Sequence, residues 1–281
     1  MTSDETTGRV SSGDVEIFYR KVGKSGRTPV LIVHGLSFFS YDWMPVASLI
    51  GEDREVVAMD MRGFGESTWS PARNYKLDAI SGDVIAVLDA LGWRKAVLMG
   101  HSFGGRVMLA TAGWHADRAA ALVSVDFAPD MNPIGRRRVA ERIGGQPDVF
   151  ASLDEAMTYH HEAPGNMVRR PRWEAFLRKA DGGYALKRDL HFRDNFKRAL
   201  EAGKSAPVPE FLWPMLKDTA IPTLVIRAGG SDMFAAETLD KVRTLNPRIQ
   251  AIELEGSHDL AGDNPNGLAR AVRDFLEGAK L

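Results

Sequence analysis

Short apolar runs, separated by longer stretches with apolar residues at helical spacing, characterise the first half of the chain. Four runs are largely apolar, as expected of strands buried on both faces of a parallel sheet. They cover residues 29–34, 55–60, 95–99 and 120–127. Residues 77–91 place apolar side chains along one stripe, which predicts an amphipathic helix. The alternation of strand and helix predicts an α/β fold with a mostly parallel central sheet and helices on both faces.

This alternation stops at residue 128. Residues 128–217 have the pattern of helices and loops, and strand and helix then return at residues 223–227, 236–245, 249–254 and 266–276. Because the ends of such an insertion must meet at the sheet edge, we expect a helical cap, or lid, inserted after the sixth strand. The predicted core is residues 1–127 and 218–281, and the predicted cap is residues 128–217.

The amino-terminal segment is polar. Residues 1–8 predict a frayed tail, and residues 10–22 predict a hairpin that turns at Ser12-Gly13. The tail is acidic and no apolar run follows it, so we expect neither a signal peptide nor a membrane anchor. A cytoplasmic location is the corresponding expectation.

The composition narrows the classes of function. The 281 residues suffice for one sizeable core with an insertion, and a net charge of -1 with 26% charged residues is ordinary for a globular protein. Neither this charge nor any apolar stretch indicates a nucleic-acid or membrane partner. The chain has no cysteine, which excludes disulfides, thiolate metal sites and a cysteine nucleophile.

One pentapeptide carries the strongest indication of chemistry. Residues 100–104 read G-H-S-F-G, between an apolar run that ends at Met99 and a helical pattern that begins near Arg106. A serine at so sharp a turn has a strained backbone, and the flanking glycines leave room for neighbouring backbone. The turn exposes the hydroxyl, and the following helix offers free N–H groups to a developing negative charge. Ser102 is therefore the predicted nucleophile.

Several motifs together make the chain resemble the α/β-hydrolase superfamily over nearly its whole length. They are His34-Gly35, the M-D-M-R-G-F-G-E-S segment of residues 59–67, the G-H-S-F-G-G turn, the cap insertion and a late E-G-S-H. The resemblance implies a serine hydrolase of this fold with a Ser-His-acid triad and no cofactor. Haloalkane dehalogenases and epoxide hydrolases of this superfamily use an aspartate nucleophile, which Ser102 disfavours.

The resemblance also assigns the partners of the serine. The superfamily places a histidine after the last strand, which here is His258, as general base and then general acid. The orienting carboxylate usually follows the seventh strand, but an ungapped match puts Ser231 there and Asp232 one residue late. A second position, at the end of the sixth strand, is Asp126, which is costly to bury unpaired. We predict Asp126 as the acid and keep Asp232 as the alternative.

By the same resemblance, the backbone amides of Leu36 and Phe103 hold the oxyanion. A metal mechanism is not indicated, because the adjacent residues 160–162 point to different sides and no H-x-x-x-H spacing exists. The glycine-rich stretches match neither a phosphate loop nor a dinucleotide fingerprint. We therefore expect no metal and no cofactor.

The predicted cap is basic, with 16 Lys and Arg against 12 Asp and Glu; the excess lies at residues 136–138 and at Arg169, Arg170 and Arg172. Two interpretations stay open: these arginines recognise an acidic substrate, or they solvate helix surfaces. Arg106 lies one helical turn beyond Ser102 and either pairs with a carboxylate or contacts substrate. The apolar candidates for a substrate pocket beneath the cap are Phe38, Trp173, Trp213 and Met233.

These features predict hydrolysis of a carboxylic ester, lactone or amide of a small organic molecule through an acyl-enzyme intermediate. Two alternatives share the fold. One is a carbon-carbon bond hydrolase of a vinylogous diketone, and the other is a ligand receptor with a vestigial triad. A strained serine disfavours the receptor, since binding alone has no use for it.

Overall fold

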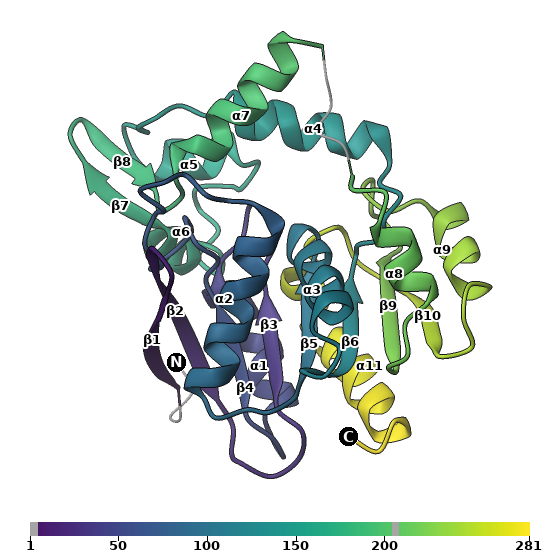
Figure 1. Cartoon of the computed structure of the whole chain (residues 1–281). Helices are drawn as coiled ribbons and strands as arrows, with labels where there is room; N and C mark the ends of the chain where they lie inside the picture. Colours follow the sequence, from purple (N-terminus) through teal and green to yellow (C-terminus); the bar gives the residue numbers. More distant parts are fainter. Residues whose placement is uncertain (1–4, 204–207) are drawn as a thin grey trace.

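The computed structural model describes residues 5–203 and 208–281, and its centre is a sheet of eight strands in the order β1-β2-β4-β3-β5-β6-β9-β10 (Figure 1). The pairs β1/β2 and β2/β4 are antiparallel. The pairs from β4 to β10 are parallel, so the predicted mostly parallel α/β fold is confirmed. The strands are β1 (Thr6–Ser12), β2 (Val15–Val22), β3 (Val30–Val33), β4 (Val56–Met59), β5 (Ala96–His101), β6 (Ala119–Val125), β9 (Thr223–Ala228) and β10 (Ile249–Leu254).

Helices cover both faces of this sheet, because successive residues of a buried strand point to opposite sides. Leu31 and Val57 face the layer of α2, α3, α8 and α9, whereas Ile32 and Ala58 face the layer of α1 and α11. The helices are η1 (Ser40–Trp43), α1 (Met44–Ile50), α2 (Leu77–Ala90), α3 (Phe103–Trp114), α8 (Leu212–Lys217), α9 (Ala236–Arg243), α10 (Leu260–Asp263) and α11 (Pro265–Gly278). Within the described residues, each helix is too short or too polar to cross a bilayer.

The predicted frayed tail is wrong for its last residues. β1 begins at Thr6 and pairs with β2 in a register that joins Thr6 to Lys21 and Ser12 to Val15. β1 is an edge strand whose side chains are exposed or half-buried, so its sequence lacks the apolar signal that a buried strand carries. Residues 1–4 of the predicted tail lie outside the described residues.

Most of the segment between β6 and β9, from residue 133 to residue 201, lies over one end of the sheet (Figure 1). It contains α4 (Pro133–Gly144), α5 (Leu153–Tyr159), α6 (Arg170–Phe176), β7 (Leu177–Ala180), β8 (Gly183–Leu186) and α7 (Leu190–Glu201). Phe150, Trp173 and Phe176 of this segment form a small apolar cluster together with Phe39, which immediately precedes η1. The antiparallel β7-β8 hairpin was not predicted, because strands of four residues carry almost no periodic signal.

The end of the predicted cap range belongs to a different layer of the molecule. Leu212 and Leu216 of α8 are buried in the same apolar cluster as the α3 residues Val107 and Met108. The chain is thus back on the sheet before β9 begins. Residues 204–207, also within the predicted cap range, lie outside the part that the structure describes.

Candidate active site

Ser102 occupies the turn between β5 and α3. Its φ of 54° and ψ of -117° lie in a region that non-glycine residues rarely adopt. A Cβ on Gly100 would lie 2.2 Å from the carbonyl oxygen of Gly104, and a Cβ on Gly104 would lie 2.2 Å from that of Val33. The turn therefore needs glycine on both sides of the serine, as the sequence motif predicted.

Three side chains from distant parts of the chain meet at this turn. Nε2 of His258 lies 3.0 Å from Oγ of Ser102, and Nδ1 of His258 lies 2.5 Å from Oδ2 of Asp126. Asp126 follows β6, and His258 lies between β10 and α10. The carboxyl ends of parallel strands share one edge of the sheet, which is why residues 24 and 156 positions from Ser102 reach it.

The buried carboxylate of Asp126 has further donors, and Asp232 faces elsewhere. The backbone N–H of Ala228 donates to Oδ1 of Asp126 (2.9 Å), and the hydroxyl of Ser231 donates to Oδ2 (2.5 Å). Buried polar side-chain atoms are usually hydrogen-bonded in this way. Asp232 instead forms an ion pair with Arg138 of α4 (2.7 Å). Of the two candidate acids, the structure brings Asp126 to the histidine.

His101 contacts His258 through a hydrogen bond to its backbone, and the sequence did not predict this contact. Nε2 of His101 donates to the carbonyl oxygen of His258 (2.8 Å), and the two rings lie 4.7 Å apart. The edge of Phe38 packs on His101 at 4.9 Å. Burial, reinforced by the neighbouring His258, holds the pKa of His101 well below its ordinary value, so the ring is neutral. The sequence gives no indication of this contact, because His101 is already explained as a residue of the G-H-S-F-G motif.

The amides predicted to hold an oxyanion lie beside the serine. Gly35 is so close that a Cβ there would sit 3.0 Å from the Cβ of Ser102. Leu36 and Phe103 line the same cavity as Ser102. Neither of their backbone N–H groups donates to another residue within the described part of the chain. Both amides are thus available to a ligand oxygen.

His34 fixes the peptide group that carries the Leu36 amide. The backbone N–H of Met61 donates to Nε2 of His34 (3.0 Å), so the proton of this buried ring is on Nδ1, which donates to the carbonyl oxygen of Gly35 (2.8 Å). Burial lowers the pKa of His34, in keeping with a neutral ring. In a planar trans peptide the N–H points opposite to the C=O. Holding the oxygen of Gly35 therefore also orients the N–H of Leu36.

A cavity of about 400 Å³ opens in front of Ser102 and His258, a size that suits a small organic ligand. Three of the predicted substrate-binding residues lie in its wall: Phe38, Arg106 and Met233. The wall also contains five cationic residues, Arg73, Lys76, Arg106, Arg136 and Arg142, and its described lining includes no aspartate or glutamate.

Arg106 forms no ion pair with any carboxylate of the described residues, so its predicted carboxylate pairing is wrong. Its Nη2 lies 3.5 Å from the sulfur of Met131, its guanidinium lies 5.6 Å from the ring centroid of Phe103, and its buried Nε has no partner. Burial, together with repulsion from Arg136, lowers the pKa of Arg106 to about 10. The side chain of Arg106 therefore lines the cavity and is not paired with a carboxylate of the described residues.

Two predicted pocket residues lie away from the cavity. Trp173 of α6 is buried, and its ring centroid lies 4.7 Å from the guanidinium of Arg172. Trp213 of α8 lies under Lys241, whose ammonium is 3.6 Å from the ring centroid. Neither belongs to the cavity wall. Aromatic content alone did not distinguish packing from ligand contact.

The arginine cluster at the start of α6 is occupied by internal carboxylates. Arg169 pairs with Glu162 and Asp259, at 2.9 and 2.8 Å. The other two pairs are Arg170 with Asp154 and Arg172 with Asp42. These three side chains therefore join parts of the segment between β6 and β9 to one another and to Asp42 and Asp259, and none of them lines the cavity.

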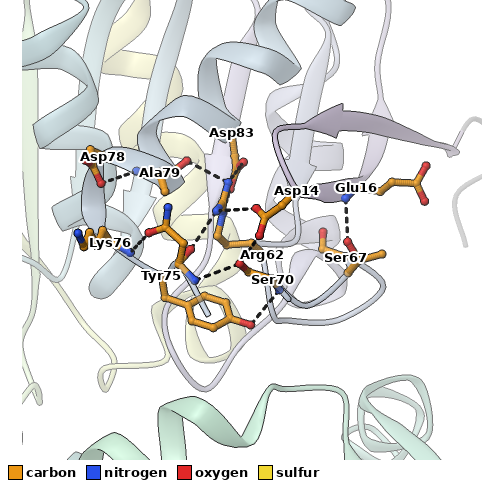
Figure 2. A network of polar contacts seen from close by, with 12 residues as sticks. Asp14, Glu16, Arg62, Ser67, Ser70, Tyr75, Lys76, Asp78, Ala79 and Asp83 are labelled. Carbon is orange, nitrogen blue, oxygen red and sulfur yellow. Dashed lines mark hydrogen bonds and ion pairs between the residues drawn. The ribbon is translucent and has the colours of Figure 1, made fainter. Parts of the chain in front are cut away.

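A polar network beside the cavity fixes the loop after β4. Figure 2 shows Arg62 of this loop bound to both carboxylate oxygens of Asp83 on α2, at 2.6 and 2.7 Å, and near Asp14 at 3.5 Å. The hydroxyl of Tyr75 donates to Asp189 at the start of α7. Burial and this bond raise the pKa of Tyr75, so the phenol remains a donor. The lining residues that this loop supplies are Arg73, Tyr75 and Lys76.

Comparison with known proteins places this geometry in a family. Residues 28–265 match the family model for the alpha/beta hydrolase fold. The 2-(acetamidomethylene)succinate hydrolase of Mesorhizobium japonicum is 23% identical over 96% of this chain and 94% of its own length. The N-formylmaleamate deformylase of Pseudomonas putida is 26% identical over 99% of this chain and 98% of its own length.

A solved structure supports the same assignment at the level of the fold. The crystal structure of an E-2-(acetamidomethylene)succinate hydrolase superposes with a TM-score of 0.81 at 22% identity, covering 97% of this chain and 99% of that one. The family match spans most of the sheet, the serine turn and the segment over it. The chain belongs to the α/β-hydrolase family and shares its hydrolase character.

Proposed function

We propose that the protein is a serine hydrolase that cleaves an ester, lactone or amide bond of a small molecule through an acyl-enzyme intermediate. The observation that carries this proposal is the line of contacts from Asp126 through His258 to Ser102 at the wall of the cavity. A serine hydroxyl is a weak nucleophile at neutral pH and needs a base within hydrogen-bond reach. Nε2 of His258 is that base.

The reaction proceeds in two halves. Oγ of Ser102 attacks the carbonyl carbon while its proton passes to Nε2 of His258, and the amides of Leu36 and Phe103 stabilise the oxyanion. Collapse of the tetrahedral intermediate breaks the bond to the leaving group, which takes the proton from His258. A water molecule, deprotonated by His258, then attacks the acyl carbon and releases the acid and free Ser102. Asp126 keeps the ring oriented and offsets its positive charge.

The charge of the cavity wall supports a substrate with a carboxylate. Arg106 faces the cavity without a carboxylate partner among the described residues, and four other cations share the wall. Arginine binds carboxylates through two parallel hydrogen bonds. The two relatives described above are a succinate derivative's hydrolase and a maleamate deformylase, and both named substrates contain carboxylates. We assign carboxylate binding to Arg106.

Active-site labelling followed by a turnover panel tests the reaction type. A fluorophosphonate probe should label the wild-type protein and leave Ser102→Ala unlabelled, and the panel should then show hydrolysis of esters or amides. An unlabelled, folded wild-type protein would overturn the serine mechanism. Turnover of vinylogous diketones without ester turnover would instead support the carbon-carbon hydrolase. Slow turnover with tight, long-lived ligand binding would support the receptor.

A pair of esters of equal length tests the role of Arg106. For a p-nitrophenyl hemisuccinate, Arg106→Met should lower kcat/KM by about 10- to 100-fold, the range expected for a lost hydrogen bond to a charged group. For the neutral p-nitrophenyl butyrate the value should change little. Arg137→Met is the matched control, because Arg137 is exposed and pairs with Glu141 outside the cavity. An equal loss on both esters would contradict the assignment.

A further inference from the structure

The loop that carries the Leu36 amide is held by arginines from the segment above the sheet. Nη1 of Arg188 donates to the carbonyl oxygen of Leu36 (3.0 Å), and Nη2 of Arg172 donates to that of Ser37 (2.8 Å). Nη2 of Arg142 donates to the hydroxyl of Ser37 (3.0 Å). Within the described residues, no group of the core donates to the carbonyl oxygens of Leu36 or Ser37. Their hydrogen bonds come from the cap.

The two peptide groups around Leu36 are thus held from opposite sides. The core holds the carbonyl oxygen of Gly35 through His34, and the cap holds the carbonyl oxygen of Leu36 through Arg188. The φ and ψ of a residue are the rotations that relate its two flanking peptide planes. Fixing both planes fixes the direction of the Leu36 N–H. An oxyanion hole depends on such fixed donors, because a donor that must reorient during the reaction stabilises less.

Arg188 is a buried cation whose two hydrogen-bond partners are both neutral. Its side chain is 3% exposed, and its second partner is the neutral Oε1 of Gln146. It forms no ion pair with a carboxylate of the described residues, unlike Arg172, which pairs with Asp42. Burying an unpaired cation is costly. Burial, together with repulsion from Arg142, lowers the pKa of Arg188 to about 10, which leaves the guanidinium charged at neutral pH.

The backbone around Arg188 is docked firmly on the core. The N–H of Gly65 donates to the carbonyl oxygen of Lys187 (2.7 Å), and the N–H of Asp189 donates to that of Gly63 (2.8 Å). The loop after β4 therefore holds the residue on each side of Arg188. A side chain anchored in this way can position the Leu36 carbonyl with little freedom to move.

We infer that Arg188 is a positioning residue for the oxyanion hole: it fixes the Leu36 amide from the cap side and places a positive charge next to it. The oxyanion hole is then built jointly by the core and the cap. This inference rests on the proposed hydrolase function. The geometry of Arg188, a buried cation bonded to the carbonyl oxygen of Leu36, is what supports it.

Two variants of the full-length protein test the inference. Arg188→Met removes both the positive charge and the hydrogen-bond donors. It should lower kcat about 10- to 100-fold, which is no more than the loss caused by removing a direct oxyanion donor. KM for the same ester should stay within about twofold, because ground-state contacts are unchanged. Arg188→Lys keeps the charge without the planar fork and should recover part of kcat. Arg178→Met is the matched control, since Arg178 is an exposed arginine of β7.

A transition-state mimic separates positioning from general damage. Boronic acids form a tetrahedral adduct on the serine, so the affinity of an alkylboronic acid should fall in Arg188→Met by the same factor as kcat/KM. Binding of the neutral alcohol product of an alkyl ester should stay within about twofold, because it carries no negative charge for the oxyanion hole to stabilise. If fluorophosphonate still labels Ser102, either of two results would overturn the inference about Arg188. One is equal weakening of both ligands, and the other is an unchanged kcat in folded Arg188→Met and Arg188→Lys. Absence of labelling in the wild-type protein would overturn the proposed function with it.

Discussion

Asp126 lies in a fully buried position in which its carboxylate has three hydrogen-bond partners. Its side chain is fully buried and contacts the amide of Ala228, the hydroxyl of Ser231 and the ring of His258. Ser231 stands where the superfamily usually has its acid, and it serves Asp126 as a donor instead. The hydroxyl of Ser231 in turn accepts from the backbone N–H of Met233 (3.0 Å). Local hydrogen bonds thus accommodate a serine at the position where the superfamily usually has its acid.

Two asparagine variants separate the candidate acids. Asp126→Asn should lower kcat by about 10³- to 10⁴-fold, because the amide favours the wrong tautomer of His258 and cannot offset its charge. Asp232→Asn should change kcat by less than about twofold, since the ion pair that it loses with Arg138 is partly exposed. Steady-state kinetics on one ester measures both. A larger loss for Asp232→Asn would reverse the assignment.

The turn from β5 to α3 shows how an element can be fixed by the absence of side chains. Gly100 and Gly104 face backbone carbonyls at distances that no Cβ tolerates. Gly105 approaches the Cβ of Phe127, where an added Cβ would lie 2.8 Å away. These contacts force Ser102 to its strained dihedral angles, and the strain is maintained by the packing of the whole turn.

Two glycine-to-alanine variants with opposite expected signs probe this element. Gly104→Ala should destabilise the protein by more than about 3 kcal/mol, because its Cβ would press on the rigid β3 backbone. Gly82→Ala should stabilise it by about 1 kcal/mol, since Gly82 is an exposed position within α2 with open space around it. Denaturant unfolding measures both values. A tolerated Gly104→Ala would show that the turn can move, contrary to its tight packing.

Across the whole molecule, several histidines of the described residues have a lowered pKa because of burial. Among them, His34 and His101 are buried beside the sheet, and His160, which is half-buried, lies between Trp173 and Tyr159. Burial, with repulsion from Arg188 and two other arginines, lowers the pKa of His160 from 6.5 to about 2. Its buried Nε2 has no hydrogen-bond partner within the described residues. Protonation of His160 is therefore confined to the unfolded chain over most of the acidic range.

Acid should destabilise the fold through these rings. Below pH 6.5 the unfolded chain binds protons that the folded His160 does not, so its contribution to the free energy of unfolding falls as pH falls. His160→Phe should remove a slope of about 1.4 kcal/mol per pH unit between pH 6 and 4. Urea unfolding at several pH values measures the slopes, and the pair at pH 8 gives the offset from altered packing. Parallel curves for wild type and variant would contradict the neutral, buried state.

The sequence by itself determined the architecture and indicated Ser102 as the candidate nucleophile. Apolar runs, glycine spacing and the break at residue 128 are local signals, and each reflects a local requirement such as two-sided burial or room in a turn. The contact of Ser102 with His258 and Asp126 was predicted through the resemblance to a family. The hairpin of β1 and β2 was predicted, but the first residues of β1 and the whole β7-β8 hairpin were missed, because short or exposed strands leave little pattern.

The tertiary structure decided everything that depends on which side chains face each other across the sheet edge. The sequence predicts Trp173 and Trp213 in the pocket, yet both pack elsewhere. It leaves carboxylate pairing and substrate contact open for Arg106, and the structure places Arg106 in the cavity wall. Arg188 gave no sequence signal, because its partner Leu36 is 152 positions away. The periodicity of apolar residues indicates which face of its own helix or strand a residue lies on. The partner of a buried charge is set by long-range packing, and for that reason only the folded chain reveals it.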